Sequence, residues 1–203
     1  MLNRKANIAV FVSGGGTNLQ ALLDAARNGD IPHGEIKLVL SSKPGVYALE
    51  RAAKANVPTV ALSKKDLGQA TFEQKILEHL KQNAIDVVVL AGFLSILSGE
   101  FLRAFHGPVL NVHPSLIPAF CGQGFYGLKV HEAALAKGVK VTGATVHFVN
   151  EIPDGGEIIA QKAVDIPEGI TKEALQRLVM EQAEWIQLPR ATEKVCKSLV
   201  EGK

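Results

Sequence analysis

Cysteine is scarce in this sequence, because Cys121 and Cys196 are the only two among 203 residues. Two cysteines so far apart cannot build the disulfide framework of a small secreted domain, and they lack the C-x-x-C spacing of a structural zinc site. We therefore expect a chain that works in a reducing compartment, the cytoplasm, and that needs no metal.

Long hydrophobic runs are absent as well. The apolar start at residues 7–12 ends after six residues in a glycine run, whereas a membrane helix needs about 18. No A-x-A cleavage pattern follows it, so it does not match a signal peptide. Charge of one sign is also lacking, since 22 Lys and Arg stand against 20 Asp and Glu and leave a net charge of +2. We expect neither a membrane nor a nucleic acid as a partner.

The sequence does contain a regular alternation of apolar and amphipathic segments. With 47% hydrophobic residues it can bury a core, and its length suits one domain. Strand-like segments at 8–12, 36–40, 58–62, 86–92 and 109–112 alternate with helical spacing at 19–26, 46–55 and 72–82. This alternation predicts an α/β fold, a mostly parallel twisted sheet flanked by helices, with 86–92 in mid-sheet.

The second half of the chain has a different character. A Pro- and Gly-rich stretch at 114–127 leads to a predicted helix at 128–137 and to two alternating runs at 141–149 and 157–166. We expect these runs to pair as antiparallel strands, joined by a turn at 150–156. The fold is therefore expected to have an antiparallel C-terminal part.

The C-terminal tail is predicted to be helical. From Thr171 onward apolar residues recur at helical spacing. Pro189 has no N–H for a helical hydrogen bond, so we expect it to interrupt the helix near Leu188.

A glycine-rich segment, Ser13-Gly14-Gly15-Gly16-Thr17-Asn18, joins the first predicted strand to the first predicted helix, and we call it the glycine loop. Backbone N–H groups and the helix dipole at such a junction hold an anion such as a phosphate. The dinucleotide fingerprint needs glycine where Leu19 stands, and no Gly-Lys-Ser/Thr of a Walker loop follows. A monophosphate is the expected ligand, while a turn that only packs strand against helix is the alternative.

Three polar residues further along the chain predict acyl-transfer chemistry. Asn111 and His113 lie two apart at a strand end, so their side chains project to the same side, where open sheets bind ligands. Asp154 lies in a turn that can return to the same crevice. Asn111 would hydrogen-bond a developing oxyanion, His113 would donate a proton or stabilise it, and Asp154 would hold the imidazolium. Taken singly, each has a plainer interpretation, as a strand-end hydrogen-bonding group or as turn chemistry.

Four blocks of sequence together resemble one enzyme family. They are Ser13-Gly14-Gly15-Gly16-Thr17-Asn18-Leu19-Gln20-Ala21-Leu22, Val89-Leu90-Ala91-Gly92-Phe93, Asn111-Val112-His113-Pro114-Ser115-Leu116-Ile117-Pro118, and Val146-His147-Phe148-Val149 followed by Asp154-Gly155-Gly156. The combination, over roughly residues 7–190, resembles folate-dependent phosphoribosylglycinamide formyltransferases. The resemblance implies one formyltransferase domain over 1–203, with a phosphate- and ribonucleotide-binding half at about 1–105 and a catalytic and folate-side half at about 106–203.

The resemblance also implies where each substrate binds. The phosphate of the ribonucleotide would lie at Gly14, Gly15, Gly16, Thr17 and Asn18. Glu184 would touch the ribose hydroxyls, with a solvated helix glutamate as the alternative. The folate would lie against Gln69, Leu90, Phe93, Leu94, Ser95, Ile96, Leu97, Asn111, Val149, Asn150 and Asp154. Core packing is the alternative for Leu94, Ile96 and Leu97.

Several other positions bear on this assignment. Many family members carry arginine at the position of Ser95. Gln69 falls near the position at which the family has an arginine that contacts the glutamate tail of the folate. The contact with this tail therefore departs from the family pattern. His131 and His147 match family positions near the pocket.

By the same resemblance, the reaction is transfer of the formyl group of 10-formyltetrahydrofolate, the co-substrate, to the amine of N1-(5-phosphoribosyl)glycinamide in de novo purine biosynthesis. Asn111 and His113 would stabilise the tetrahedral intermediate, with Asp154 beside the histidine. No metal is implied, the partners are small molecules, and the chain is expected to be a monomer or a homodimer.

Three other functions stay open on the sequence. Two are folate enzymes, a methionyl-tRNA formyltransferase and a 10-formyltetrahydrofolate hydrolase, or deformylase. Both would carry an additional module, and because the sequence has 203 residues and begins one strand before the glycine loop, we expect neither of them. The third is a non-catalytic nucleotide-sensing module that keeps the fold and its anion loop.

Overall fold

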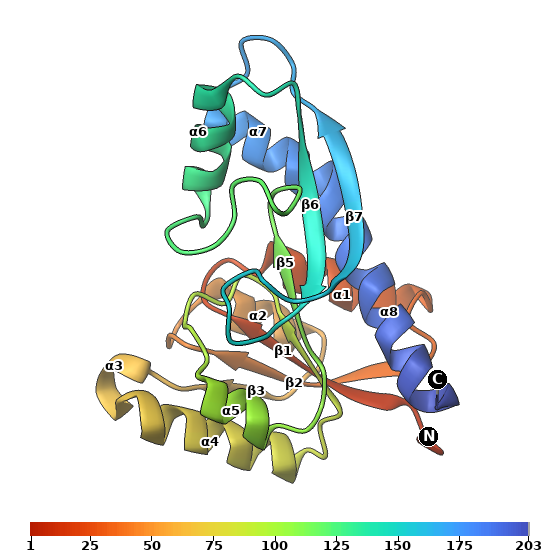
Figure 1. Ribbon diagram of the computed structural model, residues 1–203. Coiled ribbons are helices and arrows are strands. Elements are labelled where there is room, and N and C mark those ends of the chain that lie inside the picture. The colour runs from red at the N-terminus through yellow and green to blue at the C-terminus, as the bar shows by residue number, and fades with distance from the viewer. Residues whose placement is uncertain (203) are drawn as a thin grey trace.

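The sheet at the centre of the computed structural model, which describes residues 1–202, has seven strands (Figure 1). They are β1 (Ala6–Val12), β2 (Gly34–Ser41), β3 (Thr59–Ala61), β4 (Val87–Leu90), β5 (Val109–His113), β6 (Val141–Phe148) and β7 (Ile158–Asp165). Their order is β3-β2-β1-β4-β5-β6-β7. β1 to β5 run parallel, and β6 pairs antiparallel with both β5 and β7. The predicted α/β fold, mostly parallel with an antiparallel C-terminal part, is confirmed.

Helices cover both faces of this sheet (Figure 1). They are α1 (Thr17–Asn28), α2 (Tyr47–Lys54), α3 (Lys64–Leu67), α4 (Gln69–Gln82), α5 (Gly99–Ala104), α6 (Leu128–Lys137), α7 (Lys172–Val179), the π-helix η1 (Met180–Glu184) and α8 (Trp185–Glu201). Within residues 1–202, none of these helices is long and apolar enough to cross a bilayer.

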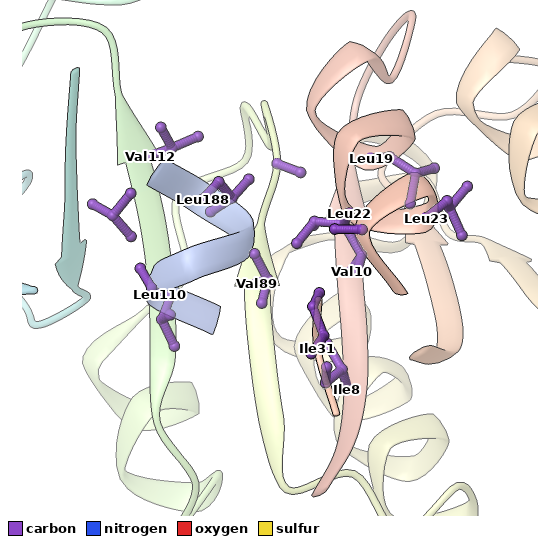
Figure 2. Packing of buried hydrophobic residues seen from close by; sticks show 14 of the residues in the cluster. Ile8, Val10, Leu19, Leu22, Leu23, Ile31, Val89, Leu110, Val112 and Leu188 are labelled. Carbon is purple, nitrogen blue, oxygen red and sulfur yellow. The ribbon is translucent and has the colours of Figure 1, made fainter. Parts of the chain in front are cut away.

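Strand β1 is buried on both faces and belongs to two cores. Ile8 and Val10 point to the face covered by α1 and α8, where Figure 2 shows Val10 near Leu22 and Ile8 near Ile31. Phe11 points to the opposite face and packs in a second cluster with Phe72 of α4. Because both faces are covered, the strand is apolar throughout and shows no polar alternation. Each such side chain contributes about 1.5–3 kcal/mol by leaving water.

The order of the strands creates a crevice at one end of the sheet. β1 lies between β2 and β4, so the connections that leave β1 and β4 turn to opposite sides. Ligands of open α/β sheets bind at the carboxyl ends of strands at such a switch point. The chain leaves β1 into the glycine loop at Ser13 and leaves β4 into Ala91 and Gly92. The strand predicted at 86–92 is β4, which is shorter, Val87–Leu90, and lies in the middle of the sheet as expected.

The predicted interruption of the tail helix at Pro189 is wrong, because Pro189 lies inside α8. The irregular segment is η1, just upstream, where the N–H of Trp185 donates to the carbonyl of Met180, five residues back. Pro189 has no N–H for the carbonyl of Trp185, and its ring crowds that carbonyl. The wider turn before α8 accommodates this crowding and places its last residue, Glu184, in the interior.

Truncation of one central side chain tests this packing. Leu110 of β5 is fully buried in the same cluster as Leu188 of α8 (Figure 2). Leu110→Ala leaves a cavity between sheet and helix and should lower the free energy of unfolding by about 2–5 kcal/mol in denaturant titration. Val141→Ala, at a position 43% exposed, is the matched control and should change it far less. Equal losses in the two variants would contradict the packing described here.

Candidate active site

Four polar side chains meet at the carboxyl end of β5, and we call Asn111, His113, His147 and Asp154 the polar cluster. Nδ2 of Asn111 donates to Oδ1 of Asp154 at 3.4 Å and lies 3.2 Å from Nε2 of His147. Nδ1 of His113 lies 3.4 Å from Oδ2 of Asp154. The structure thus brings together the three residues singled out in the sequence. Among residues 1–202, no group of three or more His, Cys, Asp or Glu is arranged to hold a metal ion.

His147 completes this cluster although it was not among the predicted catalytic residues. The antiparallel register of β5 and β6 pairs it with Asn111, and its Nε2 lies 3.5 Å from Oδ1 of Asp154. Its Nδ1 lies 2.8 Å from the carbonyl oxygen of Phe148. The only signal in the sequence was its match to a family position near the pocket, because strand register cannot be read from the strand itself.

Asp154 reaches the cluster from the turn between β6 and β7. It adopts a positive φ of 54°, which is uncommon for a residue with a side chain. Gly156 passes so close to β6 that a Cβ would lie 1.7 Å from the carbonyl oxygen of Phe148, so no larger residue fits there. Nδ2 of Asn150 donates to the carbonyl of Gly155 at 3.1 Å. Asn150, predicted to meet the folate, therefore braces the turn that carries Asp154.

The carboxylate of Asp154 is largely buried and yet favoured in its charged form. Burial by itself would raise the pKa of Asp154. Two hydrogen bonds act against burial, one from His147 and one from the backbone N–H of Gly122 at 2.8 Å. With the charge of His113 they outweigh burial and lower the pKa of Asp154 below its ordinary value. A carboxylate that stays ionised is the acceptor that an imidazolium needs beside it.

His113 is engaged at both ring nitrogens. Nδ1 faces Asp154, and Nε2 lies 2.8 Å from the carbonyl oxygen of Phe120. A ring that carries a proton on each nitrogen can donate to both acceptors. Phe120 belongs to the Pro- and Gly-rich stretch at 114–127, so this stretch closes over the imidazole and buries it.

The glycine loop leads into the N-terminus of α1, and its geometry is the one expected for an anion site. Gly16 begins the helix in the left-handed conformation, with φ 74°, and no side chain of residues 1–202 caps it. The first turn carries no acidic residue, so the free N–H groups and the positive end of the helix dipole face outward. A Cβ on Gly14 or Gly15 would meet nothing within 4 Å, which leaves open space beside them. This geometry suits a phosphate.

Asn18 and Glu184 join the glycine loop to η1. Nδ2 of Asn18 donates to Oε2 of Glu184 at 2.7 Å. Thr17 faces the same segment, with its hydroxyl 3.7 Å from Sδ of Met180. Glu184 is only 6% exposed, and burial raises its pKa to about 7 although the hydrogen bond from Asn18 favours the charged form. The alternative of a solvated helix glutamate is therefore wrong.

A cavity of about 220 Å³ lies between these groups and the polar cluster. Asn18 and Glu184 line one side of it and Asn111 lines the other. His131 also borders it, and burial, helped by the charge of His113, lowers the pKa of His131 to about 4, so its ring is neutral. A larger cavity, of about 870 Å³, lies along α1 and α2 and contains none of the polar cluster.

The segment after β4, predicted to face the folate, divides into exposed and buried side chains. Leu94 and Ile96 are 59% and 72% exposed. Leu90 and Leu97 are buried, and the ring of Phe93 packs against the aromatic side chains of the core. Only the first pair presents a free apolar surface of the kind that marks a binding site. Leu97 takes the core role that the sequence left open, and Leu90 lies in the same core cluster.

A buried carboxylate holds this segment in place. Glu73 of α4 accepts hydrogen bonds from the backbone N–H and from the hydroxyl of Ser98, both at 2.6 Å. Gln69 donates to Glu73 and to the carbonyl of Ile96, the latter at 3.2 Å. Gln69, predicted to contact the folate, therefore braces the segment after β4. Glu73 was not singled out, because a glutamate on an amphipathic helix carries no signal that it will be buried.

Two further contacts fix the rim of the cleft. Oγ of Ser13, the first residue of the glycine loop, accepts from the backbone N–H of Leu94 at 2.9 Å. The N–H of Val149 donates to the carbonyl of Val109 at 2.8 Å. Between Leu94 and Ile96, Ser95 is half-buried. The predicted phosphate and folate segments are thus tied to each other directly.

The pKa of Glu184 gives a prediction on stability. A carboxyl whose pKa rises on folding stabilises the fold fully below its ordinary pKa of 4.5, and this contribution is lost as the pH rises to about 7. Glu184→Gln removes the titration, so the decline in unfolding free energy from pH 5 to pH 8 should be about 2–3 kcal/mol smaller than in the parent.

Denaturant titrations at the two pH values measure this difference. Glu181→Gln is the matched control, because Glu181 lies in the same π-helix but is exposed and paired with Arg177 at the surface. Identical pH dependence in Glu184→Gln and the parent would show that the carboxyl does not titrate in this range.

Three comparisons place the chain among known proteins. The family model described as formyl transferase matches residues 6–192. A trifunctional purine biosynthetic protein adenosine-3 of Bos taurus is 45% identical over 87% of this chain, which spans 17% of that protein. A chloroplastic phosphoribosylglycinamide formyltransferase of Vigna unguiculata is 36% identical over 88% of this chain and 57% of its own length.

A solved structure extends this similarity to three dimensions. A glycinamide ribonucleotide transformylase of Symbiobacterium toebii has a TM-score of 0.88 and 38% identity, over 97% of this chain and 90% of that one. The resemblance noted in the sequence is thereby confirmed over nearly the whole chain. This chain belongs to the formyl transferase family.

Proposed function

We propose that this chain transfers the formyl group of 10-formyltetrahydrofolate to the amine of N1-(5-phosphoribosyl)glycinamide, a step of purine biosynthesis. The observation that carries the proposal is the convergence of Asn111, His113 and Asp154 beside a cavity whose other wall holds Asn18 and Glu184. An oxyanion site and a nucleotide site therefore share one cleft. The names of two relatives support the same acceptor and the transfer of a formyl group to it.

The ribonucleotide occupies the side of the cleft next to α1. Its phosphate binds the N–H groups of the glycine loop, at Gly14, Gly15, Gly16, Thr17 and Asn18, where the helix dipole adds to the attraction. The ribose hydroxyls donate to Glu184, which is buried and therefore makes a strong hydrogen bond. This leaves the glycinamide amine pointing through the cavity toward Asn111.

The folate occupies the other side, next to the segment after β4. The exposed side chains of Leu94 and Ile96 provide the apolar surface for its ring system, and Val149 and Asn150 border the far edge. Its glutamate tail lies outside the cleft near Ser95, which offers a hydroxyl and no cation. The tail is therefore held less tightly by charge than it would be with arginine at that position.

The transfer needs no protein nucleophile. The amine nitrogen attacks the formyl carbon and forms the new C–N bond, while the carbonyl oxygen becomes an oxyanion. The tetrahedral intermediate then collapses and breaks the bond to N10 of the folate. One proton leaves the amine and one arrives at N10, so the products are the formylated amine and tetrahydrofolate.

The polar cluster acts on this oxyanion. Nδ2 of Asn111 and Nε2 of His113 donate to it, and preorganised donors of this kind are each worth about 10²–10³ in rate. Nε2 exchanges its present acceptor, the carbonyl of Phe120, for the substrate oxygen. Asp154 keeps the Nδ1 proton of His113 in place, and His147 holds Asp154 from its other side.

We infer the setting of the reaction from the same features. About residues 1–105 bind the phosphate of the ribonucleotide, and about residues 106–203 supply the polar cluster. Each substrate also reaches the other half, because Glu184 holds the ribose, and Leu94 and Ile96 face the folate. The mechanism proposed here uses no metal ion. A cytoplasmic location is supported by Cys121 and Cys196, which are both free thiols.

A comparison of three acceptors tests the function. The purified chain is incubated with 10-formyltetrahydrofolate and either N1-(5-phosphoribosyl)glycinamide, water alone, or charged initiator tRNA. We expect tetrahydrofolate to form rapidly only with the ribonucleotide. Equal rates with water would identify a hydrolase, formylated tRNA would identify the tRNA enzyme, and no product with any acceptor would favour a nucleotide-sensing module.

Substitutions in the polar cluster test the mechanism. Asn111→Ala and His113→Ala should each lower kcat by about 10²–10³, because each removes one oxyanion donor. Binding of ribose 5-phosphate, measured by calorimetry, should stay at the parental level, because the glycine loop is intact. His106→Ala, at the opposite end of the sheet, is the control and should leave both quantities unchanged. Parental turnover in both cluster variants would exclude the mechanism.

A further inference from the structure

We propose that Arg51 is a positioning residue for the phosphate site, which fixes the glycine loop from behind without touching the substrate. The inference rests on the proposed function, because it takes the glycine loop as the place where the ribonucleotide phosphate binds. It concerns α2, a helix that contributes no residue to the cleft described above.

Helix α2 contacts three successive residues of the glycine loop. The backbone N–H of Ala48 donates to the carbonyl of Gly14 at 3.2 Å. Nε of Arg51 donates to the carbonyl of Gly15 at 2.8 Å. Gly16 lies so close to the helix that a Cβ there would come within 2.6 Å of Cβ of Ala48. The loop is therefore laid directly onto α2, with its carbonyl oxygens turned toward the helix.

The direction of these carbonyls determines the direction of the N–H groups. The peptide bonds of the glycine loop are trans, and in a planar trans peptide the C=O and the N–H point to opposite sides. Holding the carbonyl of Gly14 therefore turns the N–H of Gly15 away from α2, and holding the carbonyl of Gly15 does the same for the N–H of Gly16. Both N–H groups are presented to the side on which an anion can approach.

Arg51 is itself held in one orientation. Its Nη1 donates to Oε1 of Gln20 on α1 at 2.9 Å, and its guanidinium carbon lies 4.8 Å from the centre of the Tyr47 ring. The planar guanidinium of Arg51 thus links the glycine loop to the first turn of α1 and to the face of the Tyr47 ring. A glycine-rich segment loses much conformational freedom when it orders, so a second point of attachment lowers the cost of presenting the N–H groups.

This arrangement assigns Arg51 a role in binding and not in the transfer step. Its Nε–H and one N–H of Nη1 point to acceptors of the protein, on the side of the loop opposite the N–H groups that face the anion. Its positive charge still lies within the network that holds the loop and favours an anion there. Loss of Arg51 should therefore weaken the ribonucleotide and leave the folate side and the chemistry unaffected.

Arg51→Met tests the role, since it keeps the length of the side chain and removes both donors and the charge. We expect the KM for the ribonucleotide, and the Kd of ribose 5-phosphate measured by calorimetry, to rise about tenfold or more, the scale of one hydrogen bond to a charged group. The values of kcat and of KM for 10-formyltetrahydrofolate should stay near the parental values. Lys54→Met is the matched control, because Lys54 lies over the same Tyr47 ring from one turn further along α2.

Arg51→Lys separates positioning from charge and serves if Arg51→Met does not fold. The ammonium of lysine cannot reproduce the planar pair of hydrogen bonds to Gly15 and Gln20. Arg51→Lys should therefore recover only part of the affinity for ribose 5-phosphate. Full recovery in Arg51→Lys, parental affinity in Arg51→Met, or an equal loss of folate binding would each overturn the proposal. If the parent binds ribose 5-phosphate but transfers no formyl group, the proposed function fails, whereas the effect of Arg51 on phosphate affinity is still measured.

Discussion

The buried carboxylate of Asp154 is the constraint on which the site depends. A carboxylate taken out of water stays ionised only if donors surround it, and here they come from Asn111 and His113 of β5, His147 of β6 and the backbone of Gly122. These donors lie on separate segments, so the register of β5 against β6, the closing of the 114–127 stretch and the tight β6–β7 turn must all be correct together. The same contacts that keep Asp154 charged therefore fix the position of the groups that we propose to act on the substrate.

Much of the fold was predictable because its signals are local. Apolar runs such as β1 and β4 are buried on both faces and so lack polar alternation, which distinguishes a covered parallel sheet from an exposed one. The spacing of Asn111 and His113 is local too, since residues two apart on a strand share a face. The short helices α3 and α5 escaped prediction, because four and six residues are too few to display a helical period.

The remaining features depend on contacts between distant segments. Nothing within β6 distinguishes His147 from an outward-facing histidine until its pairing with Asn111 is known. Glu184 looked like a surface residue of an amphipathic helix, and its burial follows from the widened turn η1 that precedes Pro189. Arg51 gave no signal either, because a helix reveals in sequence which face is apolar and not which loop its polar face will meet.

The cleft contains two carboxyl groups whose surroundings act in opposite directions. Donors outweigh burial at Asp154 and lower its pKa, whereas burial outweighs the single donor at Glu184 and raises its pKa to about 7. Near neutral pH the first is a fixed negative charge beside an imidazole, and the second changes between acceptor and donor with little cost. A permanent charge is useful where an oxyanion has to be balanced by an imidazolium, and a carboxyl that can accept or donate is useful where hydroxyl groups have to be held. The division that we propose between chemistry and nucleotide binding therefore matches the electrostatics of the protein.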